Sequence, residues 1–129
     1  MGQNRSSTSI INWDRQNSLM HITVSAASGA IGAWCEANGV RLISDEIYHG
    51  IQYGDSVTSS AWQHTRSAVV FGSFSKYFSM TGWRMGWMLV PEELRRPVDV
   101  LTGNFTICPP VLGQYAALAA FTPESYAEL

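Results

Sequence analysis

Two stretches decide the fold: residues 40–48, which read VRLISDEIY, and residues 68–86, which read AVVFGSFSKYFSMTGWRMG. Each stretch begins with a short apolar run typical of a buried β-strand and then changes to polar residues. Asp45 and Tyr48 follow the first run, and Lys76 follows the second. Ligands gather at the carboxyl ends of strands in an open α/β sheet, so the sequence predicts a polar site where these two strands end.

The segments on either side alternate between helical and extended patterns. Leu112, Tyr115 and Ala119 are spaced as on the apolar face of a helix, whereas Pro97 argues against a long helix before them. The expected order is an irregular segment over 1–23, a helix over 25–38 ended by Gly39, strands over 40–44, 68–71 and 83–90, a helix starting at Pro91, and a helix over 111–121. This order predicts an α/β layer fold with a mostly parallel sheet, its strands buried on both faces.

The composition excludes several classes of protein. Of the 129 residues, 46% are apolar and only 14% are charged, so the chain is rich in material that favours burial. A net charge of −2, with its basic residues scattered, argues against nucleic-acid binding. The apolar runs are too short to cross a bilayer, so no membrane association is expected.

The two cysteines, Cys35 and Cys108, indicate neither a disulfide framework nor a metal site. Their distance in the sequence does not match any spacing typical of metal ligands. We therefore expect two reduced thiols in the core of a cytoplasmic protein that binds no metal.

Lys76 is the only lysine, against seven arginines. It lies in a Ser-x-x-Lys pattern that begins at Ser73, which is also found in serine acyl hydrolases such as β-lactamases. That chemistry needs a second lysine and a Ser-Asp-Asn loop, and the chain has neither. The alternatives for Lys76 are therefore an ordinary solvated surface amine and an amine that bonds covalently to an aldehyde cofactor.

Three blocks in series resemble the class I and II aminotransferases, which are pyridoxal 5'-phosphate enzymes of the aspartate aminotransferase-like fold. They are the D-E-x-Y block at 45–48, the S-x-S-K block at 73–76 and the M-T-G-W-R-x-G block at 80–86. Their order and spacing are similar to those of the family, and residues 104–121 resemble the segment that follows. The resemblance implies a three-layer αβα cofactor domain, of which this chain carries a part.

The resemblance also assigns catalytic roles to three residues. Lys76 is expected to form the Schiff base with the cofactor aldehyde and then to move the substrate proton. Asp45 is expected to face the pyridine nitrogen, where a carboxylate favours the protonated ring. Tyr48 is expected to donate a hydrogen bond to the phenolic oxygen of the cofactor.

The same resemblance implies a phosphate site made by Ser73, Ser75 and Arg84, the last suited by its fork of donors to a bidentate grip. The implied reaction exchanges an amino group between an amino acid and a 2-oxo acid, and the full-length family implies a homodimer. A lyase reaction on the same fold and an inactive truncated relic remain alternatives.

The resemblance covers residues 29–123 and leaves 1–28 unassigned and 124–129 as a C-terminal end. Enzymes of this family are longer than this chain, with further cofactor and substrate contacts in the additional length. We therefore expect a partial pyridoxal-phosphate-binding domain, with little or no activity alone and with apolar surface left exposed.

Overall fold

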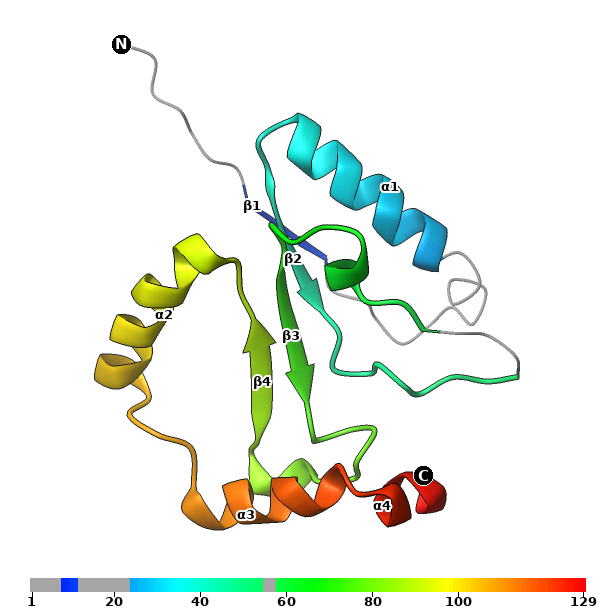
Figure 1. Ribbon diagram of the computed structural model, residues 1–129, viewed down its shortest axis with the longest axis vertical. Coiled ribbons are helices and arrows are strands. Elements are labelled where there is room, and N and C mark those ends of the chain that lie inside the picture. The colour runs from blue at the N-terminus through cyan, green and yellow to red at the C-terminus, as the bar shows by residue number, and fades with distance from the viewer. Residues whose placement is uncertain (1–7, 12–23, 55–57) are drawn as a thin grey trace.

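The computed structural model describes residues 8–11, 24–54 and 58–129. Strands alternate with helices or 3₁₀ turns over most of the chain, and its C-terminal part is helical (Figure 1). In order they are β1 (Thr8–Ile11), α1 (Val24–Ala37), β2 (Arg41–Asp45), the 3₁₀ turn η1 (Ala61–Gln63), β3 (Val69–Ser73), the 3₁₀ turn η2 (Thr81–Trp83), β4 (Gly86–Leu89), α2 (Glu92–Phe105), α3 (Val111–Ala120) and α4 (Pro123–Glu128).

The four strands form one sheet in the order β1-β2-β3-β4. The first three strands run parallel, and β4 pairs antiparallel with β3, so the predicted mostly parallel sheet is confirmed. β1 lies in the segment predicted to be irregular, and that prediction is wrong for these four residues. A strand this short carries almost no periodicity, and its pairing with β2, from Thr8 opposite Arg41 onward, defines it.

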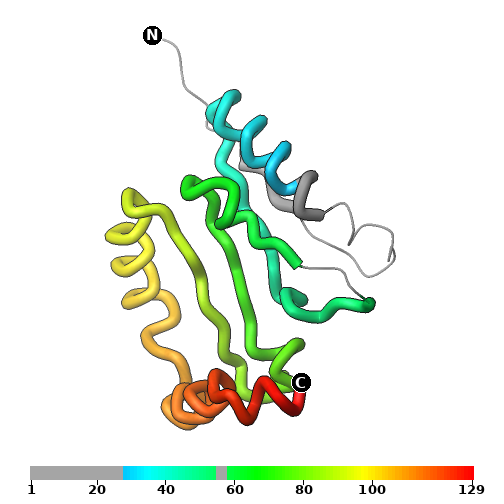
Figure 2. The backbone as a smooth tube through the Cα atoms, turned by 45° about the vertical axis from the view of Figure 1, so that its right-hand side comes forward, coloured from blue at the N-terminus to red at the C-terminus, as the bar shows by residue number. Residues whose placement is uncertain are grey.

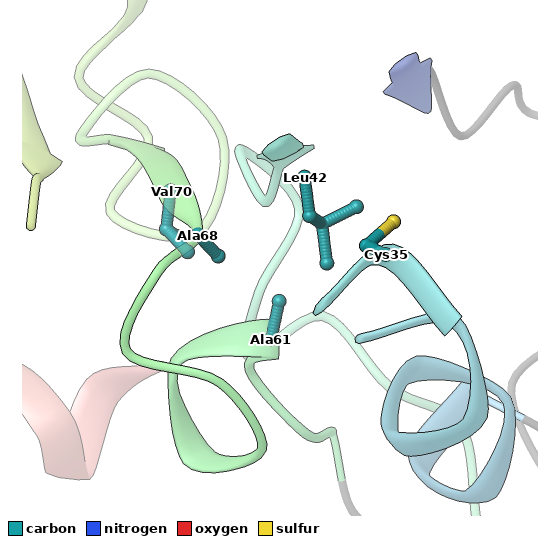
Figure 3. Packing of buried hydrophobic residues seen from close by; sticks show 5 residues of the cluster. All are labelled: Cys35, Leu42, Ala61, Ala68 and Val70. Atoms are coloured by element: carbon teal, nitrogen blue, oxygen red, sulfur yellow. The ribbon is translucent and has the colours of Figure 1, made fainter. Parts of the chain in front are cut away.

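One face of the sheet, which we call the core face, is covered by α1 and η1. Its buried apolar side chains are those of Leu42 and Val70, with Ala68 just before β3. Cys35 of α1 and Ala61 of η1 pack against them, and all five residues are buried (Figure 3). Burial of this apolar surface holds the parallel strands and α1 together.

The opposite face, which we call the open face, carries Asp45, Phe71 and Met88 at matched register positions. Phe71 is 39% exposed and Met88 is 36% exposed. The prediction that the strands are buried on both faces is therefore wrong for this chain, although the exposed apolar surface was expected.

Burial follows the strand more than the face. Val69 on the open face is buried, whereas Trp87 and Leu89, which share the core face with Val70, are 40% and 37% exposed. α1 and η1 pack over β2 and β3, and β4 is exposed along its whole length.

The strand predicted over 83–90 is shorter, because the chain turns before it. The Trp83 amide donates to the Met80 carbonyl at 3.2 Å, and Arg84 adopts a left-handed φ of 54°. A left-handed residue cannot continue an extended strand, so β4 begins only at Gly86.

The C-terminal helices differ from the sequence prediction in two respects. α2 continues through Pro97, which removes one backbone hydrogen bond from a helix that buries no residue. α3 ends before Pro123 as predicted, but it buries Gly113, Ala117 and Ala120. Leu112 and Tyr115, predicted to face the core, are 76% and 71% exposed. The small residues face inward because the helix lies close against the loop before β4 (Figure 2).

The two thiols have different environments. Cys35 is buried in the core, as predicted, whereas Cys108 is exposed, so its assignment to the core was wrong. Cys108 lies in the connection between α2 and α3, next to Ile107, whose φ is 64°. Within the described residues, no helix is both long and apolar enough to span a membrane.

Arg41 joins the start of β2 to the loop before β3 and to α2. Its guanidinium donates to the Ser67 carbonyl and to the Glu93 carboxylate, both at 2.9 Å. The backbone hydrogen bond at Glu93, and secondly the one from Arg41, lower the pKa of this carboxyl below 4.5. Glu93 thus adds stability above that pH, and the contribution is lost as the pH falls through the lowered pKa.

Arg41→Leu should therefore raise the pKa of Glu93 only part of the way to 4.5, because the larger backbone contribution remains. Carboxyl titration by ¹³C NMR measures this pKa directly. Arg95→Leu is the matched control, since Arg95 pairs instead with Glu92 at 3.7 Å. A full return to 4.5 in Arg41→Leu would show that the backbone contribution is absent.

Candidate active site

The two polar turns predicted to form a site leave neighbouring strands at the same end of the sheet (Figure 1). Asp45 is the last residue of β2 and lies opposite Phe71 of β3. One residue later, the Glu46 amide still donates to the Phe71 carbonyl at 2.8 Å. The sheet therefore fixes where the turn after β2 begins relative to β3.

Lys76 and Tyr48 are brought together from these two turns. The Lys76 ammonium Nζ lies 5.7 Å from the centroid of the Tyr48 ring, within the range of a cation–π contact. Both side chains are half-buried. The Asp45 carboxylate lies at the start of the same turn, where its Oδ1 accepts from the Ile47 amide at 3.3 Å.

Ser73 and Ser75 are linked within the turn after β3. The Ser73 hydroxyl accepts from the Ser75 amide at 3.0 Å and donates to the Met85 carbonyl at 3.4 Å. Its hydroxyl is thus bonded to the backbone rather than to Lys76. This arrangement adds to the case against the acyl hydrolase, in which the serine must be activated as a nucleophile.

Arg84 reaches this turn through Thr81. The Thr81 hydroxyl donates to the Ser75 carbonyl at 2.7 Å, and Arg84 donates to the Thr81 carbonyl at 3.3 Å. The guanidinium is exposed and uses only Nη1 in this contact, so other N–H donors remain available. Asp45 and Arg84 make their contacts inside their own turns, and neither bonds to Lys76.

The loop between β3 and β4 separates its apolar side chains from its polar ones. Phe74 is buried against Ala117 and Ala120 of α3. Phe78, Met80 and Met85 pack around this cluster, whereas Ser75, Lys76 and Arg84 do not belong to it. Packing against α3 therefore anchors the loop and leaves its polar groups accessible at the end of the sheet.

The two turns also touch at Gly50 and Tyr77. Gly50 has a φ of 92°, and a Cβ there would lie 2.9 Å from the Tyr77 ring. That ring packs in turn against Phe78 and Tyr126, at centroid distances of 5.0 and 6.5 Å. A glycine is needed here both for the backbone conformation and for the close approach.

Gly50→Ala should lower the free energy of unfolding by about 2–3 kcal/mol, since it adds a steric clash to backbone strain. Gly39→Ala is the matched control, because Gly39 has a φ of 64° and nothing within 4 Å of a Cβ. It should cost only about 1 kcal/mol. Urea unfolding of both variants measures the difference, and equal costs would contradict the Gly50–Tyr77 contact.

A hollow of about 410 Å³ lies beside the turns. Its lining includes Val70, Gly72 and Trp87 of the sheet, together with Tyr77 and Tyr126. Of the six predicted site residues only Ser73 lines it. The hollow is thus separate from the place where Lys76 meets Tyr48.

Glu46 is an important residue of this region that the sequence analysis did not single out. Its side chain is only 12% exposed, it lines the hollow, and its carboxylate ties the first turn to η1. The sequence does contain a signal that could have identified Glu46. It directly follows Asp45 at the end of a strand, and successive side chains there point to opposite faces of the sheet.

Most of the chain is similar to a known protein family. Residues 29–128 match the family "Aminotransferase class I and II". Over 100 residues the chain is 68% identical to valine–pyruvate aminotransferase of Mycobacterium tuberculosis, covering 77% of this chain and 26% of that protein. The chain thus spans about a quarter of the length of this curated relative.

Solved structures agree with this match. The crystal structure of an aminotransferase from Mycobacterium tuberculosis has a TM-score of 0.75 at 66% identity, over 78% of this chain and 28% of the other. Aspartate aminotransferase from Thermotoga maritima has a TM-score of 0.76 at 27% identity, over 94% of this chain and 33% of the other. The predicted fold, part of an aspartate aminotransferase-like α/β domain, is thereby confirmed. The chain belongs to the class I and II aminotransferases, a family of transferase enzymes.

Proposed function

We propose that this chain forms part of the cofactor site of a pyridoxal 5'-phosphate-dependent aminotransferase. The observation that carries the proposal is the placement of the only lysine. Lys76 follows β3, and its amine lies 5.7 Å from the ring of Tyr48, which follows the neighbouring strand β2. The family to which the chain belongs generally uses this cofactor.

The residues present fit the cofactor in their chemistry. When bound, pyridoxal phosphate supplies an aldehyde for a primary amine and a ring that withdraws electrons from the substrate. Lys76 would provide the amine and would then hold or move a proton at Nζ. Asp45 would provide a carboxylate that favours a protonated ring nitrogen, and Tyr48 would provide a phenol as a donor for the ring oxygen.

A second group of side chains fits the phosphate. Ser75 and Arg84 are linked through Thr81 in one turn, and Ser73 begins that turn. The guanidinium donors of Arg84 that its contact with Thr81 leaves unused suit a dianionic phosphate, since such charge-assisted hydrogen bonds are short and strong. These three residues would position the ring without taking part in proton transfer.

The proposed reaction exchanges an amino group between an amino acid and a 2-oxo acid. The Mycobacterium tuberculosis relative is named for valine and pyruvate, so these are the first substrates to assay. We further propose a cytoplasmic location and, for a full-length enzyme containing this segment, a homodimer. A segment this short relative to its family should bind the cofactor with little or no turnover, because orientation of the reacting groups is incomplete.

Titration with pyridoxal phosphate, followed by borohydride reduction and peptide mapping, tests the proposal. A visible absorbance band and a reduced label on Lys76 are expected. Label only on the N-terminal amine would contradict the proposal and favour the inactive relic. Where turnover is found, amino-group exchange indicates the transferase, and release of ammonia with a 2-oxo acid indicates the lyase.

A further inference from the structure

We infer that Glu46 is a positioning residue that holds Asp45 and Tyr48 in place for the cofactor, without touching the cofactor itself. The inference rests on the proposed function, because it concerns the same site. Glu46 is not among the six residues that the sequence analysis predicted for the cofactor site.

The Glu46 carboxylate joins three parts of the chain. Its Oε1 accepts from the Ala61 amide at 2.8 Å and from the Ser44 hydroxyl at 3.0 Å, and its Oε2 lies 3.8 Å from His49 Nδ1. Ala61 is the first residue of η1, fifteen positions further along the chain. A carboxylate that is 12% exposed and hydrogen-bonded in this way resists displacement, since its loss would leave buried donors unpaired.

The backbone of Glu46 is fixed as well. Its amide donates to the Phe71 carbonyl at 2.8 Å, and its carbonyl accepts from the His49 amide at 2.9 Å. Both the main chain and the side chain of one residue thus anchor the turn. Asp45 precedes this anchor directly, and Tyr48 follows it by two residues.

The two adjacent carboxylates have different roles because they point in opposite directions. Asp45 lies on the open face, in register with Phe71, and holds only its own turn through the Ile47 amide. Glu46 lines the hollow on the other side and reaches η1. Glu46 therefore acts on the cofactor only through the turn that carries Asp45 and Tyr48.

The chain offers a control in Glu36, a second bridging carboxylate, which is exposed. Its carboxylate accepts from the Thr65 and Ser67 hydroxyls, so it also bridges segments distant in the sequence. It lies at the end of α1, and its contacts hold the segment before β3 rather than either polar turn. Loss of Glu36 should reduce stability without moving the site.

The test uses the full 129-residue chain, with Glu46→Leu, Glu46→Gln and Glu36→Leu, at a temperature where circular dichroism shows each variant folded. Pyridoxal phosphate affinity and the wavelength of the bound cofactor's absorbance maximum are measured. Glu46→Leu should weaken the affinity about tenfold and shift the maximum. Glu46→Gln, which keeps an acceptor for Ala61, should remain within about threefold of the original chain. Glu36→Leu should leave the maximum unchanged.

A smaller folded fraction lowers the amount of bound cofactor but does not shift its absorbance maximum. A shifted wavelength therefore indicates a change in the site and not merely a loss of stability. An unshifted maximum in Glu46→Leu, or an equal shift in Glu36→Leu, would overturn the inference. If Glu46→Leu does not fold, Glu46→Asp replaces it, because the shorter side chain withdraws the carboxylate from the Ala61 amide. Unaltered affinity and wavelength in Glu46→Asp would likewise overturn the inference. If the unsubstituted chain gives no label on Lys76, the proposed function fails first, and the two failures are thereby distinguished.

Discussion

Lys76→Arg should abolish the borohydride-stable attachment of pyridoxal phosphate to side chains of this protein, leaving at most the N-terminal amine labelled. Lys76 is the only lysine in the sequence, and a guanidinium does not form the required bond with an aldehyde. Arginine retains the positive charge near the Tyr48 ring, so the fold should change little. Mass spectrometry of the reduced chain measures the loss directly.

A second amine placed elsewhere provides the control for this prediction. Arg95 lies on α2, with its side chain 76% exposed, and far from the two turns in the fold (Figure 1). The double variant with Lys76→Arg and Arg95→Lys restores one lysine but not its position. It should stay at least about tenfold below the original chain in labelling at low cofactor concentration. Equal labelling would show that any exposed amine suffices and that Lys76 has no special site.

Asp45→Asn should lower transamination about a thousandfold, and Tyr48→Phe only about tenfold. An amide in place of the carboxylate no longer favours a protonated ring nitrogen, so the electron-withdrawing power of the cofactor is lost. Loss of the Tyr48 hydroxyl removes a single hydrogen bond to the cofactor, which changes the electron-withdrawing power of the cofactor ring only slightly. Steady-state kcat/KM with valine and pyruvate is the measurement.

Turnover requires a longer chain, so these two variants are compared in a chimera. Residues 29–128 would replace the matching segment of the Mycobacterium tuberculosis relative, with which the chain shares 68% identity over 100 residues. The unsubstituted chimera sets the reference rate, and cofactor saturation is checked by absorbance. Equal activity of the two variants would refute the role assigned to Asp45.

The order of helices and strands was largely predictable from the sequence. Short apolar runs, glycines and prolines favour or end a helix or strand through preferences that extend over only a few residues. Gly39 has the left-handed φ of 64° expected at the end of α1, and Cys35 is buried as the core of that helix requires. β1 was not predictable, because its four residues become a strand only by pairing with β2. The inward face of α3 was likewise mistaken, since Gly113 faces inward only because Met85 and Trp83 lie close to it.

The groups available for chemistry could be identified from local motifs. A carboxylate and a phenol lie at the end of β2, and an amine, two hydroxyls and a guanidinium lie at the end of β3 and in the loop that follows. Such groups can be identified because motif spacing places them at strand ends, whatever packs around them. How these groups are held depends on the three-dimensional fold. The Lys76–Tyr48 approach, the close contact of Gly50 with Tyr77 and the anchoring of Glu46 to Ala61 each join residues 15 or more positions apart. Their geometry depends on which strands pair and which face each side chain occupies, and no local pattern encodes that.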